Sequence, residues 1–180
     1  MALVGYVKHL FKTRPLLSNC LTYGTLFVGA EFSQQAVNKH FAKARNEVLE
    51  YDFAGIGRCA VLGSSILPSL LFMWYKWLDR TFVGAAAKTV VLKVLLDQCL
   101  MTPTSISVFY IGMSTLEFKS DILAEWKQKI GPTYLTSWFF WIPAQAINFA
   151  LLPPPARVVY VASASFIWIN ILCWFKRQSM

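Results

Sequence analysis

Apolar residues fill five long stretches of the chain, separated by charged residues, glycines and prolines. The stretches run from about Leu16 to Val37, Phe53 to Lys76, Thr89 to Leu116, Gly131 to Pro153 and Val158 to Phe175. A helix rises about 1.5 Å per residue, so about 20 residues cross the hydrocarbon core of a bilayer. The pattern predicts an all-α fold. We expect an integral membrane helical bundle with four transmembrane spans plus a C-terminal apolar helix, which is either a fifth span or a re-entrant or surface-packed segment.

The Lys and Arg side chains leave the number of crossings open. If the last stretch does not cross, ten of them lie on one side and six on the other, with Arg58 inside a span. If it does cross, Lys176 and Arg177 change sides and the split becomes eight against eight. The positive-inside rule expects an unequal split. It therefore leans towards four crossings, and both topologies remain open.

Strongly polar residues interrupt the apolar stretches at one-turn spacing. A charge near the bilayer centre costs roughly 2.5 to 3.5 kcal/mol or more, so these side chains should face other helices or water. They either bond to one another across a dry bundle, with Arg58 paired to Asp97 or Glu31, or line a hydrated path. The candidate pore or intramembrane polar network consists of Glu31, Gln34, Gln35, Arg58, Lys93, Asp97, Gln98, Gln145 and Asn148.

Small residues and prolines should shape the helices. Gly24 and Gly29 in the first span allow close helix contact, as small residues do in membranes. The second span carries a small-residue face of Gly55, Gly57, Gly63, Ser64 and Ser65. Pro68, Pro103 and Pro143 act either as gating hinges or as static kinks. Static kinks are preferred, because they are ordinary in membrane helices.

Composition supports a membrane protein. The chain is 56% hydrophobic and 14% charged, with a mean hydropathy of +0.48, which is too apolar for one soluble core of 180 residues. Its net charge of +8 comes from basic residues in the connections and at both ends. That distribution is typical of span flanks that meet anionic lipid. The expected partner is the lipid bilayer, with no direct nucleic-acid binding, since no such motif accompanies the charge.

Residues 1–14 predict a basic amphipathic N-terminal helix, followed by the helical bundle over residues 15–180 in a single membrane domain, 1–180. Apolar residues from Leu3 to Phe11 repeat at helical spacing, and Lys8 and Lys12 share another face. Such a segment is either an interfacial helix, which we favour, or an internal mitochondrial address. The C-terminal residues are not the Ser-Lys-Leu peroxisomal signal.

No reactive or metal-binding pattern is visible along the chain. Each cysteine stands alone, and the two histidines have no acidic residue at metal-ligand spacing. Nothing resembles a nucleophile with its base or a glycine-rich phosphate loop. We therefore expect no enzyme, no cofactor and no metal site. The isolated residues are Cys20, Cys59, Cys99, Cys173, His9 and His40.

Several short motifs, taken in order, resemble the Mpv-seventeen family of small mitochondrial inner-membrane and peroxisomal membrane proteins. They extend from about Pro15 to Trp174. The branch called Mpv-seventeen-like protein is resembled most at Ile106 to Ser114, Asp121-Ile122, Lys127-Gln-Lys129 and Thr133-Tyr-Leu135. The family motifs are Gly29 with Ser33-Gln34-Gln35, Pro68 before Trp74-Tyr75-x-x-Leu78-Asp79-Arg80, Leu96-Asp97-Gln98 with Pro103, Trp141-x-x-x-Gln145-x-x-Asn148-Phe149 with Pro153 and Arg157, and Trp168 with Trp174.

The chain departs from this pattern in its first span. The family's Gly-Asp is replaced by Gly29-Ala30-Glu31, which turns the carboxylate by about 100° around the helix. The partner of Glu31 therefore does not carry over from the family.

The resemblance implies a four-span helical protein of an organelle membrane. We expect the mitochondrial inner membrane ahead of the peroxisomal membrane, because the basic amphipathic start is present and the Ser-Lys-Leu end is absent. Family members are proposed to form weakly selective pores. They are linked to reactive-oxygen metabolism and to upkeep of mitochondrial DNA, without an established catalytic activity.

Two function classes follow: a weakly selective channel for small solutes, or a non-conducting membrane scaffold or assembly factor. Polar residues inside several spans favour the channel, while the modest size and the lack of a charged ring favour the scaffold. A homo-oligomer is compatible with either.

Overall fold

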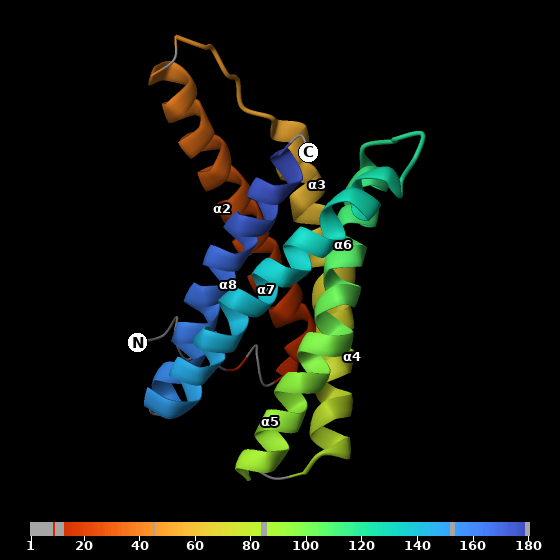
Figure 1. The fold of residues 1–180 in the computed structure, drawn as a ribbon, viewed down its shortest axis with the longest axis vertical. Coiled ribbons are helices and arrows are strands. Elements are labelled where there is room, and N and C mark those ends of the chain that lie inside the picture. The colour runs from red at the N-terminus through yellow and green to blue at the C-terminus, as the bar shows by residue number, and fades with distance from the viewer. Residues whose placement is uncertain (1–8, 10–12, 45, 84–85, 152–153, 179–180) are drawn as a thin grey trace.

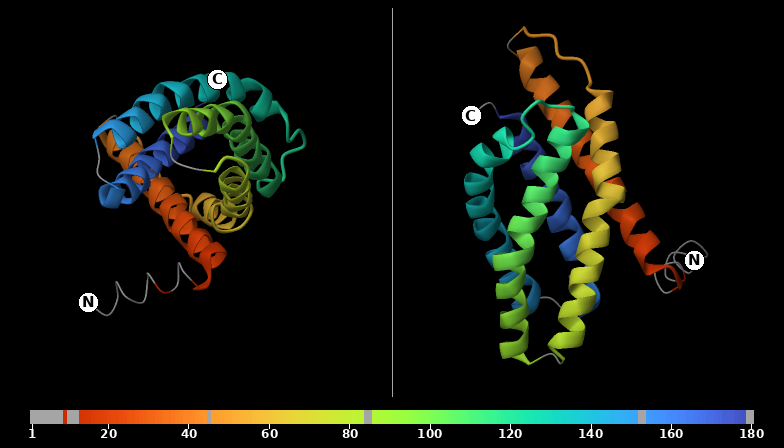
Figure 2. Two further views of the ribbon diagram at one scale, coloured as in Figure 1. Left: turned by 90° about the horizontal axis from the view of Figure 1, so that it is seen from below. Right: turned by 90° about the vertical axis from the view of Figure 1, so that its right-hand side faces the viewer.

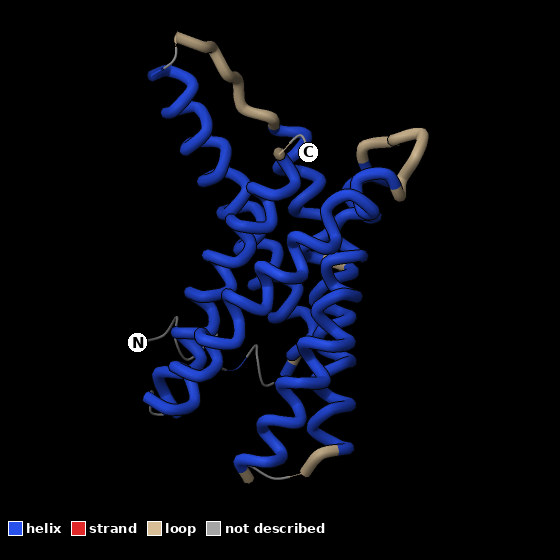
Figure 3. Tube along the Cα trace, in the orientation of Figure 1, coloured by secondary structure: helices blue, strands red, loops and turns tan. Residues whose placement is uncertain are grey.

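The computed structural model describes residues 9, 13–44, 46–83, 86–151 and 154–178, and every regular element among them is helical (Figure 3). This confirms the all-α prediction. The expected N-terminal helix over residues 1–14 lies almost entirely outside the described residues. The elements are α2 (Pro15–Ala44), α3 (Phe53–Ser64), α4 (Ile66–Thr81), α5 (Ala87–Leu96), the π-helical turn η1 (Asp97–Met101), α6 (Thr102–Leu116), α7 (Ala124–Leu151) and α8 (Pro154–Arg177).

The helices form long rods that run alternately up and down the molecule (Figures 1 and 2). The rods are α2, α3 with α4, α5 with η1 and α6, then α7, and finally α8. The connections 46–52 and 117–123 and the end of α8 lie at one end of the bundle, at the top of Figure 1. The connection after α4 and the start of α2 lie towards the other. The helix α2 extends beyond the expected end of the first span at Val37 to Ala44, and residues 46–52 belong to the connection that leads to α3.

The C-terminal stretch is a continuous 24-residue helix that packs against α2 and α7. It runs from the lower end of α7 back to the upper end of the bundle (Figure 1). The helix α8 therefore extends along the length of the bundle.

Two of the three prolines singled out in the sequence interrupt their helices. Proline lacks an N–H and clashes with the carbonyl four residues earlier. For Pro68 that residue is Ser64, and the chain breaks between α3 and α4 at Ser65, with φ −122° and ψ −87°. For Pro103 the carbonyl belongs to the π-helical turn η1, which ends two residues before it. Pro143 lies inside a continuous α7. The kinks expected at Pro68 and Pro103 are therefore confirmed.

Two of the rods meet the length and hydropathy of a membrane span: Phe53–Leu78 and Ala87–Leu116. Only 28% of the most apolar window of each is buried inside the bundle, so neither is the hidden core helix of a soluble protein. Large apolar side chains such as Met73, Leu95 and Leu100 are exposed on these rods. Such a surface is suited to lipid.

The helices α2 and α3 pack closely because both carry glycine at their contact. A Cβ added to Gly63 would lie 2.7 Å from Cβ of Phe27, and one added to Gly24 would lie 3.0 Å from Cβ of Ser64. Phe27 itself is 3% exposed and belongs to the central core cluster. The small-residue contact expected in these spans is thus confirmed at Gly24 and Gly63. In contrast, a Cβ added to Gly57 meets nothing within 4 Å.

We expect Gly63→Ala to lower the free energy of unfolding by about 1–3 kcal/mol, because its methyl group collides with the Phe27 side chain. The matched control is Gly57→Ala, in the same helix. There, alanine should be neutral or stabilise the protein by up to about 1 kcal/mol through helix propensity. Unfolding of both variants in detergent measures the difference. Equal effects of the two substitutions would contradict the close packing of α2 on α3.

Candidate functional site

The polar residues predicted from the sequence form two separate groups. One group, with Glu31, Gln35 and Arg58, lies among many charged side chains at the upper end of the bundle, which we call the charged end. The other, with Asp97 and Gln98, lies along a cavity inside the bundle, which we call the inner cavity. The full charged end consists of Glu31, Gln35, Asp52, Arg58, Glu117, Lys119, Glu125, Lys129, Lys176 and Arg177.

Glu125 is the centre of one half of the charged end. Its Oε2 accepts from Nζ of Lys119 at 2.8 Å and of Lys176 at 2.6 Å, and its Oε1 accepts from Lys129 Nζ at 3.0 Å. Glu117 shares two of these lysines, Lys119 at 2.8 Å and Lys176 at 2.9 Å. The Lys129 ammonium also donates to the backbone carbonyl of Lys176 at 2.7 Å. The first turns of α7 are thereby tied to the last turn of α8.

The lysines determine the charge state of these two acids. Burial alone would raise the pKa of Glu125, but hydrogen bonds from Lys119, Lys176 and Lys129 outweigh it and lower the pKa to about 2. Burial likewise opposes ionisation of Glu117, yet bonds from Lys119 and Lys176 lower its pKa. In Lys119, desolvation is outweighed by the two carboxylates, which raise its pKa. All three groups are therefore charged at neutral pH.

The other half of the charged end joins α2 to α3 and α8. Arg177 forms an ion pair with Oε1 of Glu31, and Gln35 Nε2 donates to the same oxygen at 2.8 Å. The Gln35 amide also binds the backbone of Asp52, accepting from its N at 2.8 Å and donating to its O at 3.0 Å. Asp52 in turn accepts from the backbone N of Gly55 at 2.8 Å and caps α3. One glutamine thus holds the loop against α2.

Arg58 has carboxylate partners, as expected, but they are not the predicted ones. Its Nη2 lies 3.1 Å from Oδ2 of Asp52, and its Nε lies 3.8 Å from Oε1 of Glu117. The prediction of Asp97 or Glu31 was wrong. Asp97 bonds to Trp74, which lies on the same rod as Arg58. At 1.5 Å per residue, Trp74 and Arg58 are about 24 Å apart along that rod. In two antiparallel rods, the residues that lie beside each other are those at similar distances from the connection between the rods. Arg58 and Asp97 lie towards opposite ends of the bundle, so they do not meet.

The inner cavity has a volume of about 390 Å³ and is walled by α2, α4, η1, α6, α7 and α8. Asp97, Gln98 and Gln145 contribute to its lining, and Trp74 Nε1 donates to Oδ1 of Asp97 at 3.1 Å. Ser105 lines the cavity as well. Among the described residues, the buried Oε1 of Gln98 and the buried Oγ of Ser105 have no hydrogen-bond partner in the protein. Buried polar atoms next to such a space are typical sites for bound water.

An apolar layer separates the inner cavity from a smaller one at the charged end, the end cavity, of about 180 Å³. Phe27, Ile106 and Leu172 line the inner cavity, whereas Phe109 lines the end cavity. All four belong to one buried cluster, with the rings of Phe27 and Phe109 6.1 Å apart. The two cavities have no lining residue in common. Side chains therefore close the space between them.

Two of the remaining predicted residues, Gln34 and Lys93, fall outside both groups. Gln34 is buried on α2 but lines neither cavity, and Lys93 is half-buried on α5, one turn before Asp97. The backbone of Asn148 lies on α7, and its side chain is outside the described part of the structure.

Sequence reasoning missed most of the charged end. It placed the basic residues of the connections and of the chain ends on span flanks that meet anionic lipid, whereas Lys129 is buried beside buried Glu125. The available signal was the abundance of opposite charges at connections that antiparallel rods bring together. It also missed the proximity of Cys59 and Cys173, for which the sequence carries no signal.

Comparison with known proteins agrees with this helical membrane architecture. The profile of the Mpv17 / PMP22 family matches residues 114–173. The Mpv17-like proteins of Xenopus laevis and Bos taurus are each 32% identical to the chain, covering 94% and 91% of it and 80% and 79% of their own lengths. Protein sym1 of Aspergillus oryzae is 32% identical over 88% of the chain and 89% of its own length. No solved structure matches.

The chain therefore belongs to the Mpv17 / PMP22 family, which confirms the resemblance seen in the sequence. It is a membrane protein, and the family points to the mitochondrial or the peroxisomal membrane.

We expect Glu125→Gln to destabilise the protein by about 3–5 kcal/mol. The substitution keeps the shape but leaves buried Lys129, whose side chain is 5% exposed, without its carboxylate. The measurement is the unfolding free energy in detergent at neutral pH. Glu50→Gln, in the exposed 46–52 loop, is the control and should change little.

The same pair of variants gives a pH test. Glu125 has a lowered pKa in the folded state, so its contribution is present above the ordinary value of 4.5 and is lost as the pH falls towards about 2. Wild type and Glu50→Gln should lose stability across that window more steeply than Glu125→Gln. Parallel pH profiles would mean that the Glu125 cluster contributes no net stability.

Proposed function

We propose that the protein forms a weakly selective path for small solutes through an organelle membrane, with the inner cavity as its hydrated section. The proposal rests on one observation: the buried atoms Gln98 Oε1 and Ser105 Oγ have no hydrogen-bond partner in the protein, and both residues line a cavity of about 390 Å³. In a dry bundle, each such atom would cost about 1–3 kcal/mol. A rotation of either side chain that turns its oxygen towards water in the cavity would remove that cost, which supports a path for polar solutes.

Asp97 is the acid that we expect to bias this path towards cations. It lies on the π-helical turn η1, a kind of local distortion found frequently at functional sites. Its carboxylate lines the cavity while Trp74 fixes one oxygen. Acidic side chains along a narrow path favour cation passage.

The apolar layer of Phe27, Ile106, Phe109 and Leu172 acts as the closed gate in this proposal. Apolar constrictions block ions and polar solutes by excluding water, without filling every void. The charged end then forms a vestibule on the other side of the layer. Its acids and bases are paired with each other, so the vestibule adds little selectivity of its own.

We expect Asp97→Asn to reduce the preference for cations over anions without unfolding the bundle, because the amide keeps the shape and the Trp74 contact but removes the charge. Reversal potentials of the purified protein in planar bilayers, recorded under a salt gradient, measure the preference. Glu50→Gln, remote from the inner cavity, is the charge control. An unchanged reversal potential would remove Asp97 from the path.

A second variant separates a closed channel from a protein that does not conduct. Phe27→Ala thins the apolar layer and should raise the open probability, whereas Phe139→Ala, on a side chain that is 82% exposed, should not. If neither wild type nor folded Phe27→Ala conducts at any voltage, the channel proposal is overturned. The protein would then be a scaffold or assembly factor, and Asp97 a helix-packing residue.

The mitochondrial inner membrane is the location that we propose, with the peroxisomal membrane as the alternative. The basic, acid-free residues 1–14 and the sequence family support it. The links to reactive-oxygen metabolism and mitochondrial DNA upkeep rest on family resemblance alone. We also propose that all five rods cross the bilayer, because α8 returns over its whole length to the charged end. The lipid bilayer and small solutes are the proposed partners.

Tags at the two termini test location and topology together. The start of α2 and the end of α8 lie towards opposite ends of the bundle, so five crossings put the tags on opposite sides of the membrane. In mitochondria stripped of their outer membrane, protease should remove one tag and leave the other. Loss of both tags would indicate an even number of crossings, and recovery in peroxisomes alone would reverse the choice of organelle.

A further inference from the structure

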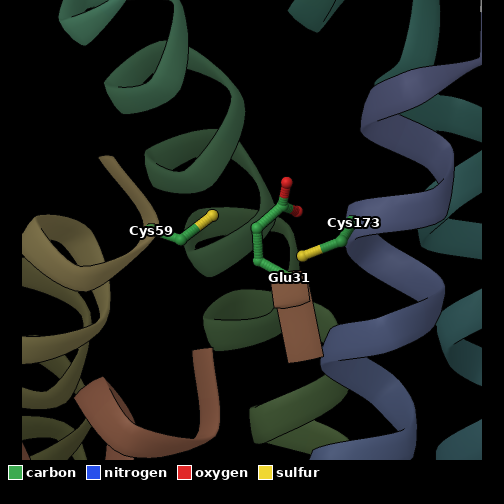
Figure 4. Close-up of side chains that lie close together, drawn as sticks. All are labelled: Glu31, Cys59 and Cys173. Atoms are coloured by element: carbon green, nitrogen blue, oxygen red, sulfur yellow. The ribbon is translucent and has the colours of Figure 1, made fainter. Parts of the chain in front are cut away.

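Three potential metal ligands from separate helices meet beside the end cavity. They are Glu31 of α2, Cys59 of α3 and Cys173 of α8, whose ligand atoms all lie within 4.8 Å of one another. Figure 4 shows both thiols directed towards the Glu31 carboxylate. The residues are 5%, 1% and 1% exposed, respectively. We propose that they form a binding site for a thiophilic divalent cation, with Zn²⁺ as the closest chemical match.

The donor set and its spacing suit zinc. Zn²⁺ binds cysteine thiolates at about 2.3 Å and carboxylate oxygens at about 2.0–2.2 Å in a tetrahedron, which places two thiolates roughly 3.8 Å apart. Ligand atoms already within 4.8 Å of one another need only small side-chain movements to reach this geometry. The end cavity is lined by all three residues. It offers an entry route and space for a water molecule as the fourth ligand.

Two neighbouring side chains hold the carboxylate in position. Gln35 Nε2 donates to Glu31 Oε1 at 2.8 Å, and Arg177 forms its ion pair with that same oxygen. These bonds orient the carboxylate without occupying Oε2, which is left for the metal. Hydrogen bonds that fix a metal-binding carboxylate are a regular part of such sites.

The charges balance when the metal binds. Zn²⁺ displaces one proton from each thiol and forms two Zn–S bonds and one Zn–O bond, so that two protons leave through the end cavity. The thiolates, carboxylate and ion together carry one negative charge. Arg177 and Arg58, both at the end cavity, lie close enough to compensate it.

A disulfide between Cys59 and Cys173 is the competing outcome. It would use the two thiols alone, whereas the oriented carboxylate beside them supplies a third ligand of the kind that a cation needs. The convergence of three ligands favours the ion. This inference does not depend on whether the protein conducts.

Cobalt is a spectroscopic probe for the site in the reduced, full-length protein in detergent. Titration with Co²⁺ should give a thiolate-to-cobalt charge-transfer band and tetrahedral d–d bands at one ion per chain, and Zn²⁺ should abolish them. Cys59→Ser, Cys173→Ser and Glu31→Gln should each weaken binding by about tenfold or more. Cys99→Ser, which alters an exposed cysteine, is the matched control and should bind as wild type does.

A test without substitutions guards against variants that fail to fold. Zn²⁺ should protect Cys59 and Cys173 of wild type from alkylation by a maleimide and leave Cys99 reactive. The proposal is overturned if wild type shows no charge-transfer band, or if the band survives in a folded Cys59→Ser/Cys173→Ser variant. It is equally overturned if the reduced protein binds no Co²⁺ and the pair cross-links on exposure to air, because the site is then a disulfide.

Discussion

The ion cluster around Glu125 is the constraint on which the arrangement of the last three rods depends. Removing a charge from water costs several kcal/mol, so this carboxylate is tolerable only if its lysines converge on it. Lys119 comes from the connection after α6, Lys129 from α7 and Lys176 from the last turn of α8. Their convergence requires α8 to run the full length of the bundle back to the start of α7. The path of the C-terminal helix therefore follows from electrostatics as much as from hydropathy.

Because the paired charges gather at one end of the bundle, the middle of the bundle can be apolar. Ionic groups at the charged end satisfy one another, so the interior can hold an apolar layer around Phe27 and Phe109 without facing an unpaired charge. Asp97 lies on the other side of that layer, bonded to Trp74 at the wall of the inner cavity. Glu31, Gln35 and Arg58 bond to other groups of the protein at the charged end. Asp97 and Gln98 line the inner cavity, and hydration of that cavity is our proposal.

The sequence predicted those features that depend on local chemistry. Apolar stretches of bilayer length became helices, and the kinks at Pro68 and Pro103 follow from the missing N–H of proline. The predicted ion-pair partner of Arg58 was wrong, because that choice depends on the position of each residue along its rod. Helical periodicity tells which face Arg58 occupies, but its level relative to Asp97 follows only from the connection that joins the rods. The approach of Cys59 to Cys173 requires α3 and α8 to be neighbours, which no local pattern specifies.

The proposed metal site and the apolar layer share one structural unit. Cys59 and Cys173 belong to the same buried cluster as Phe27 and Phe109, and Glu31 follows the cluster residue Ala30 on α2. A metal–thiolate bond of about 2.3 Å tolerates little separation of its ligands. If opening of the layer separates α2, α3 and α8, the open state must bind the ion more weakly than the closed state. By linkage, the bound ion then stabilises the closed state by the same factor, so one cation would control the layer through ligand spacing alone.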